Sequence, residues 1–329
     1  MKYNNLGRTG LHVSELGFGC GSIGGLLVRG DYPSMREVVG RAIELGINYF
    51  DTASQYGNGQ SEVNLGAVLR ELRPDVLVGT KVRLKAEEMS QIGAAVTASV
   101  EASLRRLGRE ALDLIQLHNH IGFQRQPEQD PDRVSLHELD AVRQAFERLR
   151  QQGKVRSWGM TGLGETGALH EAVATGAFQT IQVPYNVLNP SAGALVPPDF
   201  PFQDFGQLIT HAVQQEIGVI AIRILAGGAL SGGPDRHPFA SRSVNPLASE
   251  AAYRDDVTRA RRFTFLVEDG VVSKLVEAAV RFAVSQTGIS TALVGISSRD
   301  QLEQAVKYVE RGPLPADALE SIRATWSSP

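Results

Sequence analysis

The stretch SMREVVGRAIELGINYFD, residues 34–51, contains the unit that decides the fold, which is a helix followed at once by a strand. Ser34 and Glu37 have the spacing of a capping box, apolar residues recur at positions 38, 42 and 45, and Gly46 is placed to end the helix. The run INYFD then has the character of a buried strand. Its last residue is Asp51, so this strand ends on a carboxylate.

The same unit recurs along the whole chain, with no change of composition that would mark a linker. Runs that resemble buried strands begin near residues 16, 47, 76, 112, 155, 179, 218 and 291, and segments of helical periodicity separate them. Eight strands, each followed by a helix, are the content of a (β/α)8 barrel, whereas an open doubly wound sheet usually has fewer. The sequence therefore predicts the α/β class and a TIM barrel.

The chain of 329 residues is longer than the usual domain of roughly 100 to 150 residues, but it fits one large barrel. We predict a single domain over 1–329, with an N-terminal β-hairpin over 1–14, the barrel over 15–311, and a C-terminal helix and tail over 312–329. Three connections are long: 119–134, 186–204 and 225–265. Each follows a strand, so we expect them at the C-terminal mouth, where the active sites of such barrels lie.

Composition excludes several classes of partner. The chain is 42% hydrophobic and 21% charged with a formal net charge of −3, so no excess of positive charge indicates a nucleic acid or an anionic membrane. No apolar run approaches the roughly 20 residues that span a bilayer, and the N-terminus lacks the apolar core of a signal peptide. We expect a cytoplasmic protein with a small-molecule partner, and the oligomeric state is not readable.

Cysteine and histidine give no sign of a metal site. The one cysteine, Cys20, rules out an intrachain disulfide and a cysteine-built metal site. Seven scattered histidines show no spacing of the HExxH kind, so the sequence predicts no metal.

A dinucleotide fingerprint occurs near the N-terminus, and it is misleading. GCGSIG, residues 19–24, matches G-x-G-x-x-G directly after a strand, with Glu44 20 residues beyond. That fingerprint requires a helix to open at the glycines, so that the helix N-terminus meets a pyrophosphate. Here the chain continues GLLVRGDYP, and no helix is expected to start there. We therefore interpret the glycines as a tight mouth loop that brings backbone close to a ligand.

Polar residues end three consecutive predicted strands. Asp51 ends the second, Lys81 ends the third, His118 ends the fourth, and Tyr56 lies in the loop after the second. Taken singly, such an aspartate often caps a turn, a lysine is usually solvated, and a histidine is usually a satisfied core residue. Their joint placement at one end of a barrel indicates a catalytic site.

This set suits the protonation of a carbonyl oxygen while a hydride arrives at carbon. An ammonium about 4 Å from a phenol, at an effective dielectric constant of about 20, is worth roughly 4 kcal/mol, or about three pK units. We therefore expect Lys81 to lower the pKa of Tyr56 enough for general-acid work. Asp51 would keep Lys81 charged and oriented, and His118 would hydrogen-bond the same substrate oxygen.

A set of ordered motifs resembles the aldo-keto reductase family over essentially the whole chain. The motifs are, in order, GRTGLHVSELGFG, YFDTASQYGNGQSE, VGTKVRL, DLIQLHNH, GKVRSWGMTG, IQVPYNVLN and LVGISSRDQLEQA. The resemblance implies a (β/α)8 barrel, a nicotinamide cofactor bound extended at the mouth without a Rossmann fold, and carbonyl reduction through an Asp-Tyr-Lys-His tetrad. Carried over to this chain, the tetrad is Asp51, Tyr56, Lys81 and His118, with Tyr56 as the proton donor.

The cofactor positions match the family less uniformly. Gln182 corresponds to the glutamine that binds the carboxamide, whereas Thr161-Gly162 replaces the usual Ser-Asn. Ile222 replaces the aromatic residue that commonly stacks on the nicotinamide, and Arg223 replaces a serine and is expected to meet the pyrophosphate. The full set that the resemblance implies for the cofactor is Gly21, Ser22, Asp51, Thr161, Gln182, Ile222, Arg223, Leu225, Gly295, Ser297, Ser298, Arg299, Gln301 and Gln304.

The start of the last barrel helix is expected to determine which of the two nicotinamide cofactors binds. Ser297, Ser298 and Arg299 open this helix, where backbone donors, hydroxyls and a guanidinium favour a phosphate. We interpret the stretch as a 2′-phosphate site, which predicts NADPH rather than NADH.

The resemblance leaves more than one function open. The first is the reversible NADPH-dependent reduction of an aldehyde or ketone. The others are a cofactor-binding regulatory subunit resembling the potassium-channel β subunits, and an NAD-dependent aldose dehydrogenase. The three long mouth loops are expected to determine which substrate binds, and their conformation cannot be read from the sequence. Ile23, Asn119 and Asn186 are expected near the pocket.

Overall fold

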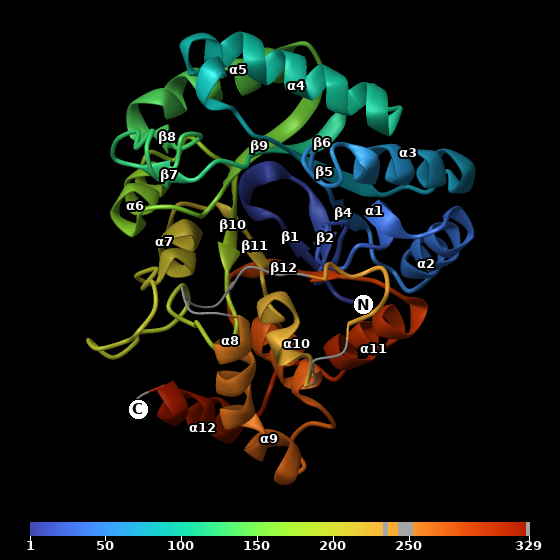
Figure 1. Ribbon diagram of the computed structural model, residues 1–329, viewed down its shortest axis with the longest axis vertical. Helices are drawn as coiled ribbons and strands as arrows, with labels where there is room; N and C mark the ends of the chain where they lie inside the picture. The colour runs from blue at the N-terminus through green and yellow to red at the C-terminus, as the bar shows by residue number, and fades with distance from the viewer. Residues whose placement is uncertain (233–235, 243–252, 327–329) are drawn as a thin grey trace.

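A closed barrel of eight parallel strands forms the centre of the molecule (Figure 1). The structure is a computed structural model and describes residues 1–232, 236–242 and 253–326. In pairing order the barrel strands are β3 (Leu16–Gly19), β4 (Tyr49–Asp51), β5 (Leu77–Val82), β6 (Leu112–Leu117), β9 (Val155–Thr161), β10 (Thr180–Pro184), β11 (Gly218–Ile222) and β12 (Ile289–Gly295), which pairs with β3. The predicted (β/α)8 barrel is confirmed, and each strand begins close to its predicted start.

Helices surround the barrel on the outside (Figure 1). Those that alternate with the strands are α2 (Tyr32–Glu44), α3 (Gln60–Leu72), α4 (Ile92–Leu107), α5 (Leu139–Gln151), α6 (Thr166–Ala174), α7 (Leu208–Gln214), α10 (Leu275–Ser285) and α11 (Arg299–Glu310). The remaining helices are α1 (Leu26–Arg29), α8 (Tyr253–Ala260), α9 (Phe265–Glu268) and α12 (Ala316–Trp326), with 3-10 turns η1 (Gly7–Thr9), η2 (Ala86–Gln91), η3 (Leu136–Glu138), η4 (Ala226–Ser231) and η5 (Arg261–Phe263). The shorter strands are β1 (Tyr3–Asn5), β2 (His12–Ser14), β7 (Ile121–Gly122) and β8 (Val134–Ser135).

Helix α5 illustrates how the outer helices are fixed to the sheet. Leu139, Val142, Phe146 and Leu149 recur at helical spacing and are all buried, whereas the charged residues of the helix lie on its outer face. Full burial of such side chains stabilises the fold by about 1.5 to 3 kcal/mol each. The stripe predicted from periodicity is therefore the surface that packs on the barrel.

The start of α2 differs from its prediction. The helix begins at Tyr32 rather than near Ser34, because Asp31 is the N-cap and its side chain accepts a hydrogen bond from the Ser34 backbone at 2.8 Å. Pro33 fits in the first turn, where its missing N–H has no helical partner. The predicted Ser34–Glu37 capping box is therefore wrong, because a stronger cap precedes it.

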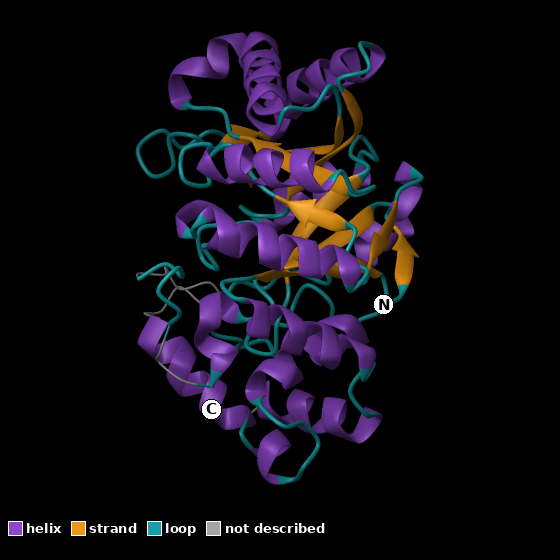
Figure 2. Ribbon diagram, turned by 90° about the vertical axis from the view of Figure 1, so that its right-hand side faces the viewer, coloured by secondary structure: helices purple, strands orange, loops and turns teal. Residues whose placement is uncertain are grey.

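The N-terminal hairpin closes the floor of the barrel. Strands β1 and β2 pair antiparallel, as predicted, and Leu6, Leu11 and Val13 pack against interior side chains of the barrel, among them Tyr49 and Leu114. Figure 2 shows the barrel from the side, with the hairpin at one end and the long loops at the opposite end. The floor is thus apolar and filled, which leaves the mouth as the end where a ligand enters.

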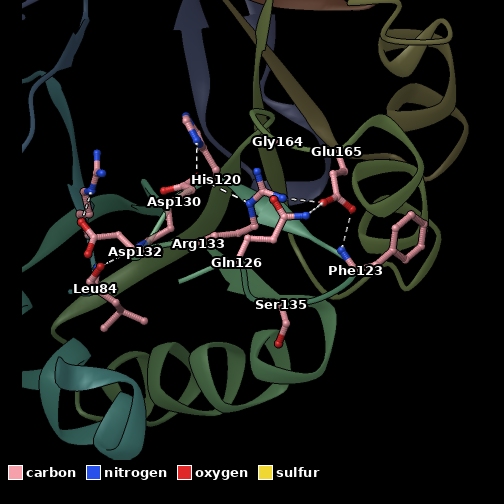
Figure 3. A network of polar contacts seen from close by, with 12 residues as sticks. Leu84, His120, Phe123, Gln126, Asp130, Asp132, Arg133, Ser135, Gly164 and Glu165 are labelled. Atoms are coloured by element: carbon pink, nitrogen blue, oxygen red, sulfur yellow. Dashed lines mark hydrogen bonds and ion pairs between the residues drawn. The ribbon is translucent and has the colours of Figure 1, made fainter. Parts of the chain in front are cut away.

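The first long loop, 119–134, is held by a polar network (Figure 3). Glu165 accepts hydrogen bonds from Arg133 at 2.5 Å, from Gln126 at 3.3 Å and from the backbone N–H of Phe123 at 3.1 Å. The loop also contributes β7 and β8, which pair with each other. The loop is therefore anchored to Glu165, the residue that precedes α6.

Two parts of the prediction concern residues outside this description. Within the connection 225–265, residues 233–235 and 243–252 lie outside the described residues, as do residues 327–329 of the tail. The division of the chain into hairpin, barrel and C-terminal helix stays a prediction.

The glycine-rich stretch 19–24 has a different role from a dinucleotide fingerprint. A helix does begin just beyond it, contrary to expectation, but α1 is a single turn of four residues. A Cβ placed on Gly24 would lie 2.6 Å from the backbone nitrogen of Ile296, so Gly24 permits the close packing of two loops. Gly19, Gly21 and Gly24 also line the cavity at the mouth, as expected of a mouth loop. The closed barrel excludes the Rossmann alternative.

A glycine between two outer helices provides a test of this packing. A Cβ on Gly66 of α3 would lie 2.5 Å from the carbonyl oxygen of Leu107 in α4, so we expect Gly66→Ala to lower the free energy of unfolding by about 1 to 3 kcal/mol. In the matched control Gly40→Ala, on α2, the new methyl group meets only Leu72 Cδ1 at 3.7 Å. Urea unfolding should show this control gaining about 0.5 to 1 kcal/mol from helix propensity. Equal stability of the two variants would contradict the packing described here.

Candidate active site

A buried ion pair joins the mouth ends of β4 and β5. The Lys81 ammonium donates to Asp51 Oδ1, to the carbonyl oxygen of Thr52 at 2.8 Å and to the hydroxyl oxygen of Tyr56 at 3.4 Å. The Lys81 side chain is 0% exposed and that of Asp51 is 4% exposed. Charges this deep are tolerated only when they are paired and their remaining hydrogen-bonding capacity is satisfied. The three acceptors around Lys81 meet that requirement.

The second carboxylate oxygen of Asp51 is held from three strands. Oδ2 accepts hydrogen bonds from the Tyr49 hydroxyl at 3.1 Å, from Gln116 at 3.4 Å and from Gln182 at 2.6 Å. Tyr49 and Gln116 were not predicted as site residues, although each lies two positions before a predicted catalytic residue. Since side chains alternate across a strand, positions i and i+2 share the interior face, and this spacing is a signal that could have identified both.

Tyr56 and His118 face each other across the mouth. Their rings are in edge contact, with centroids 5.9 Å apart, and the Lys81 ammonium lies 5.0 Å from the centroid of the tyrosine ring. Tyr56 lies in the turn after β4. Its backbone N–H donates a hydrogen bond to the Ala53 carbonyl oxygen at 3.1 Å, which closes this turn. The structure thus brings together all four residues predicted as the tetrad.

The pKa values differ from expectation in one respect. Burial raises the pKa of the Tyr56 phenol, and the opposing effect of Lys81 does not overcome it. The predicted lowering of the Tyr56 pKa is therefore wrong for this structure, because it omitted desolvation, which disfavours the phenolate. Burial also lowers the pKa of Lys81, but the Asp51 carboxylate and Tyr56 more than compensate, so the net shift is upward and Lys81 stays charged.

His118 is neutral at physiological pH. Burial lowers the pKa of its imidazole well below the usual value, and the nearby cations, first Lys81 and then Arg83, lower it further. The protonated phenol of Tyr56 and the neutral imidazole of His118 can therefore both donate a hydrogen bond to one substrate oxygen near pH 7.

A cavity of about 550 Å³ runs from Tyr56 and His118 to the start of α11. Most residues predicted for the cofactor line it: Gly21, Ser22, Asp51, Thr161, Gln182, Ile222, Arg223, Leu225, Gly295, Ser297, Gln301 and Gln304. Ile23 lines it as well, as expected of a pocket neighbour. Ser298 and Arg299 do not line the cavity, and Lys81 lies behind the Tyr56 hydroxyl.

Asn119 and Asn186 were predicted as pocket neighbours, and that prediction is wrong. Both are buried and turned toward backbone groups instead of the cavity. Asn119 binds both the N–H and the carbonyl of Leu84, at 2.9 and 2.7 Å. Asn186 accepts from the N–H groups of Leu188 and Asn189, each at 2.9 Å. Both amides satisfy loop backbone that has no partner in a strand.

The residues predicted to bind a phosphate at α11 already make hydrogen bonds and ion pairs within the protein. The Ser297 hydroxyl donates to the Gly24 carbonyl at 2.6 Å, and Ser298 caps the helix by accepting from the Gln301 N–H at 3.4 Å. Arg299 is half-exposed and pairs with Glu37 at 2.9 Å and with Glu303 at 3.0 Å. Arg299 thus lies at the surface beside the cavity.

The sequence analysis missed several residues of the cavity wall. They come mainly from the connection 225–265 and from α10, and they include Gly228, Ser231, Arg236, His237, Tyr253, Lys274 and Val276. Arg236 donates to the Tyr253 hydroxyl at 3.1 Å and to the Gly227 carbonyl at 2.9 Å. These residues carry no periodic pattern, so nothing in the sequence marked them as part of the wall.

The donors at the inner end of the cavity fit a nicotinamide. The hydroxyl oxygen of Thr161 is buried and has no hydrogen-bond partner among the described residues. Thr161 pairs in register with Gln182 on the neighbouring strand, and both line the cavity. A hydroxyl beside an amide suits a carboxamide, which both donates and accepts. In the described part of the chain, no group of three or more histidine, cysteine or acidic side chains could hold a metal, and no helix is long and apolar enough to cross a membrane.

A barrel that presents a phenol, a lysine and a neutral histidine at the end of such a cavity defines an oxidoreductase that acts with a nicotinamide cofactor. The family model described as Aldo/keto reductase family matches residues 15–327. The chain belongs to the aldo/keto reductase family, and it is an NAD(P)H-dependent oxidoreductase.

Relatives in this family have names that indicate different functions. The chain is 29% identical to L-galactose dehydrogenase of Arabidopsis thaliana, over 98% of this chain and 96% of that protein. It is 25% identical to a probable voltage-gated potassium channel subunit beta of the same plant, over 95% of this chain and 93% of that protein. Aldo-keto reductase AKR11C1 from Bacillus halodurans, in its holo form, superposes with a TM-score of 0.70 at 26% identity and covers 99% of this chain and 96% of that one.

The lowered pKa of His118 predicts how stability depends on pH. Below about pH 6.5 an unfolded histidine takes up a proton, while folded His118 stays neutral, so acid favours the unfolded state. Between pH 7.5 and 5.5 we expect the free energy of unfolding, measured with urea, to fall more steeply in the native protein than in His118→Gln. The difference in slope should reach up to about 1.4 kcal/mol per pH unit. Equal losses in both proteins would show that the pKa of His118 is not depressed.

Proposed function

We propose that the chain catalyses the reversible, NADPH-dependent reduction of an aldehyde or ketone to an alcohol, with Tyr56 as the proton donor. The observation that carries the proposal is the hydrogen bond from the Lys81 ammonium to the Tyr56 hydroxyl oxygen, at the inner end of the cavity and with Asp51 behind it. When bound, the reduced nicotinamide supplies the hydride.

In this proposal the protein's own groups orient the substrate and deliver the proton. The Tyr56 hydroxyl and the His118 imidazole donate hydrogen bonds to the carbonyl oxygen, which polarises the carbonyl and fixes its position. As the oxygen takes the proton from Tyr56, the phenolate that remains is stabilised by Lys81, whose charge is kept by Asp51. The burial of the pair excludes water, which strengthens each of these interactions.

The cofactor is proposed to lie along the cavity from Gln182 to α11. Thr161 and Gln182 would hold the carboxamide, and the aliphatic side chain of Ile222 would cover one face of the ring. The phosphate end would lie against Gly21, Ser22, Leu225, Gly295, Ser297, Ser298, Arg299, Gln301 and Gln304. A cytoplasmic location, and the expectation of neither a nucleic-acid nor a membrane partner, rest on composition and stay predictions.

Replacement of Tyr56 tests the chemistry directly. Tyr56→Phe removes the proton donor without changing the shape of the ring, so we expect kcat for a panel of aldehydes to fall by about 10² to 10⁴ while NADPH binding is kept. Turnover is followed by NADPH absorbance and binding by fluorescence. The control Tyr3→Phe removes a surface hydroxyl bonded to Gly46 of the adjacent loop and should leave both unchanged. Full activity of Tyr56→Phe would contradict the assignment of the proton donor.

The preference for NADPH is tested at Arg299. In Arg299→Gln we expect the Kd for NADPH to rise about tenfold and the Kd for NADH to stay the same, because a charge-assisted contact to the 2′-phosphate is lost. Glu37→Gln removes one of the two carboxylates that pair with Arg299 and should lower the Kd for NADPH. Tighter binding of NADH than NADPH by the native protein would favour the NAD-dependent alternative.

A regulatory subunit is the alternative function, since a potassium-channel β subunit is among the relatives. The tetrad is compatible with both functions, and the enzyme is favoured because the cavity reaches the side chains of Tyr56 and His118. A stable stoichiometric partner, found together with no turnover of any aldehyde or ketone, would reverse this preference.

A further inference from the structure

Tyr49 is a tyrosine inside the barrel that contacts the catalytic ion pair. It lies two residues before Asp51 on β4, and its side chain is completely buried. Its hydroxyl donates a hydrogen bond to Asp51 Oδ2 at 3.1 Å, whereas the Lys81 ammonium donates to Oδ1. Tyr49 is not one of the residues that line the cavity. It therefore reaches the reacting groups only through the ion pair.

Two glycines on the neighbouring strands make room for this side chain. A Cβ on Gly79 of β5 would clash with the Tyr49 hydroxyl oxygen, and a Cβ on Gly17 of β3 would lie 3.2 Å from the ring carbon Cδ1. Gly79 is paired in register with Asp51. Glycine weakens the interior of a strand and often marks a place where another group approaches closely. Here the glycine at position 79 leaves space for the hydroxyl that bonds to Asp51.

The filling of space does not explain the hydroxyl of Tyr49. The ring packs against apolar side chains at the floor of the barrel, among them Leu6 and Leu114, and a phenylalanine would fill the same space. A buried hydroxyl is costly unless it is hydrogen-bonded, and a bond to a carboxylate is stronger than one to a neutral acceptor. Burial and the Asp51 carboxylate raise the pKa of the Tyr49 phenol well above its usual value. Tyr49 therefore stays protonated and remains a donor to Asp51.

The charges around Tyr56 act on its proton in opposite directions. Burial has the largest effect and raises the pKa of Tyr56, the Lys81 ammonium lowers it, and the Asp51 carboxylate raises it. The other ionisable groups that interact with Tyr56 are Cys20, His118 and Arg223. Burial raises the pKa of the thiol and lowers that of the imidazole, so both are neutral at physiological pH. A change in the charge of Asp51, as felt at Tyr56, thus changes how readily Tyr56 gives up its proton.

We propose that Tyr49 is a positioning residue for proton transfer, because its hydroxyl holds the Asp51 carboxylate and offsets part of its negative charge at Tyr56. The inference rests on the proposed function. A hydrogen bond donated to a carboxylate stabilises the charge and turns the positive end of the O–H dipole toward it. The phenolate that remains when Tyr56 has lost its proton is then repelled less by Asp51. Tyr49 thus makes Tyr56 a stronger acid without contacting the substrate.

The first test measures the pKa of Tyr56 in the full chain, with and without NADP⁺, and requires no turnover. The chain has seven tyrosines, and the ionisation of Tyr56 is the part of the near-ultraviolet phenolate absorbance that is lost in Tyr56→Phe. In Tyr49→Phe we expect the midpoint of this ionisation to rise by about 0.5 to 1 pH unit, because the charge of Asp51 is less offset. A midpoint that is unchanged or lower would overturn the proposal.

The second test measures the turnover of benzaldehyde by Tyr49→Phe. We expect kcat to fall by about three- to tenfold, because part of the effect of one hydrogen bond to a charged group is lost. The KM for the aldehyde and the Kd for NADPH should stay the same, since Tyr49 does not line the cavity. A purely structural role would lower the free energy of unfolding and leave the Tyr56 midpoint as it is. No turnover by the native protein would contradict the proposed function, whereas the ionisation of Tyr56 would still decide this inference.

Tyr185→Phe is the matched control, because it also removes a buried hydroxyl. The Tyr185 hydroxyl donates to Gln286 Oε1 at 3.1 Å, its ring stacks on Phe282, and it does not line the cavity. This variant should keep both kcat and the Tyr56 midpoint. The same rise of the midpoint in both variants would mean that the loss of any buried hydroxyl disturbs Tyr56, and the proposal would fail.

Gly79→Ala tests the contact without removing the hydroxyl. The new methyl group displaces the hydroxyl from Asp51, so the Tyr56 midpoint should rise as it does in Tyr49→Phe. In the double variant the methyl group meets the ring only at Cζ, 3.1 Å away, and we expect little further rise. Two shifts that simply add would show that Gly79 and the Tyr49 hydroxyl act independently, which contradicts the proposal.

Discussion

The buried ion pair between Lys81 and Asp51 is the interaction on which the rest of the site depends. Burying two charges costs free energy. Replacing only one partner of the pair leaves the other charge uncompensated, which destabilises the fold by about 3 to 5 kcal/mol. That is a large share of the roughly 5 to 15 kcal/mol by which a domain is stable. Tyr49, Gln116 and Gln182 therefore do more than fill the barrel, because they satisfy the Asp51 oxygen that Lys81 does not reach.

This pair also explains how a tyrosine with a raised pKa can serve as an acid. A proton donor must be protonated when the substrate binds, and burial ensures this by disfavouring the phenolate of Tyr56. It must also be stable after the proton has left, and the Lys81 ammonium provides that stabilisation only as charge develops on the phenol oxygen. Stabilisation that grows toward the transition state is the kind that accelerates a reaction. Burial and the ion pair thus act at different stages of the same step.

The sequence predicted the barrel and the grouping of the tetrad because both follow from local pattern. A strand end is visible in the sequence, and parallel strands in a closed barrel bring their ends together. The direction of the Tyr56 pKa shift was not predictable, because it depends on burial depth, which only packing determines. Asn119 and Asn186 turned inward for a related reason, since loop backbone needs partners that no periodic pattern reveals. The wall formed by Arg236 and Tyr253 arises from a connection without regular pattern.

Arg223 and Arg299 were both predicted to meet phosphate, and their surroundings separate them. Arg299 is half-exposed and lies between Glu37 and Glu303, where water and salt screen its charge and an arriving anion can exchange with a carboxylate at little cost. Arg223 lies in the cavity wall, where burial weakens its screening and where its charge is felt by His118. Burial therefore makes the charge of Arg223 act on its neighbours more strongly than the exposed charge of Arg299 does.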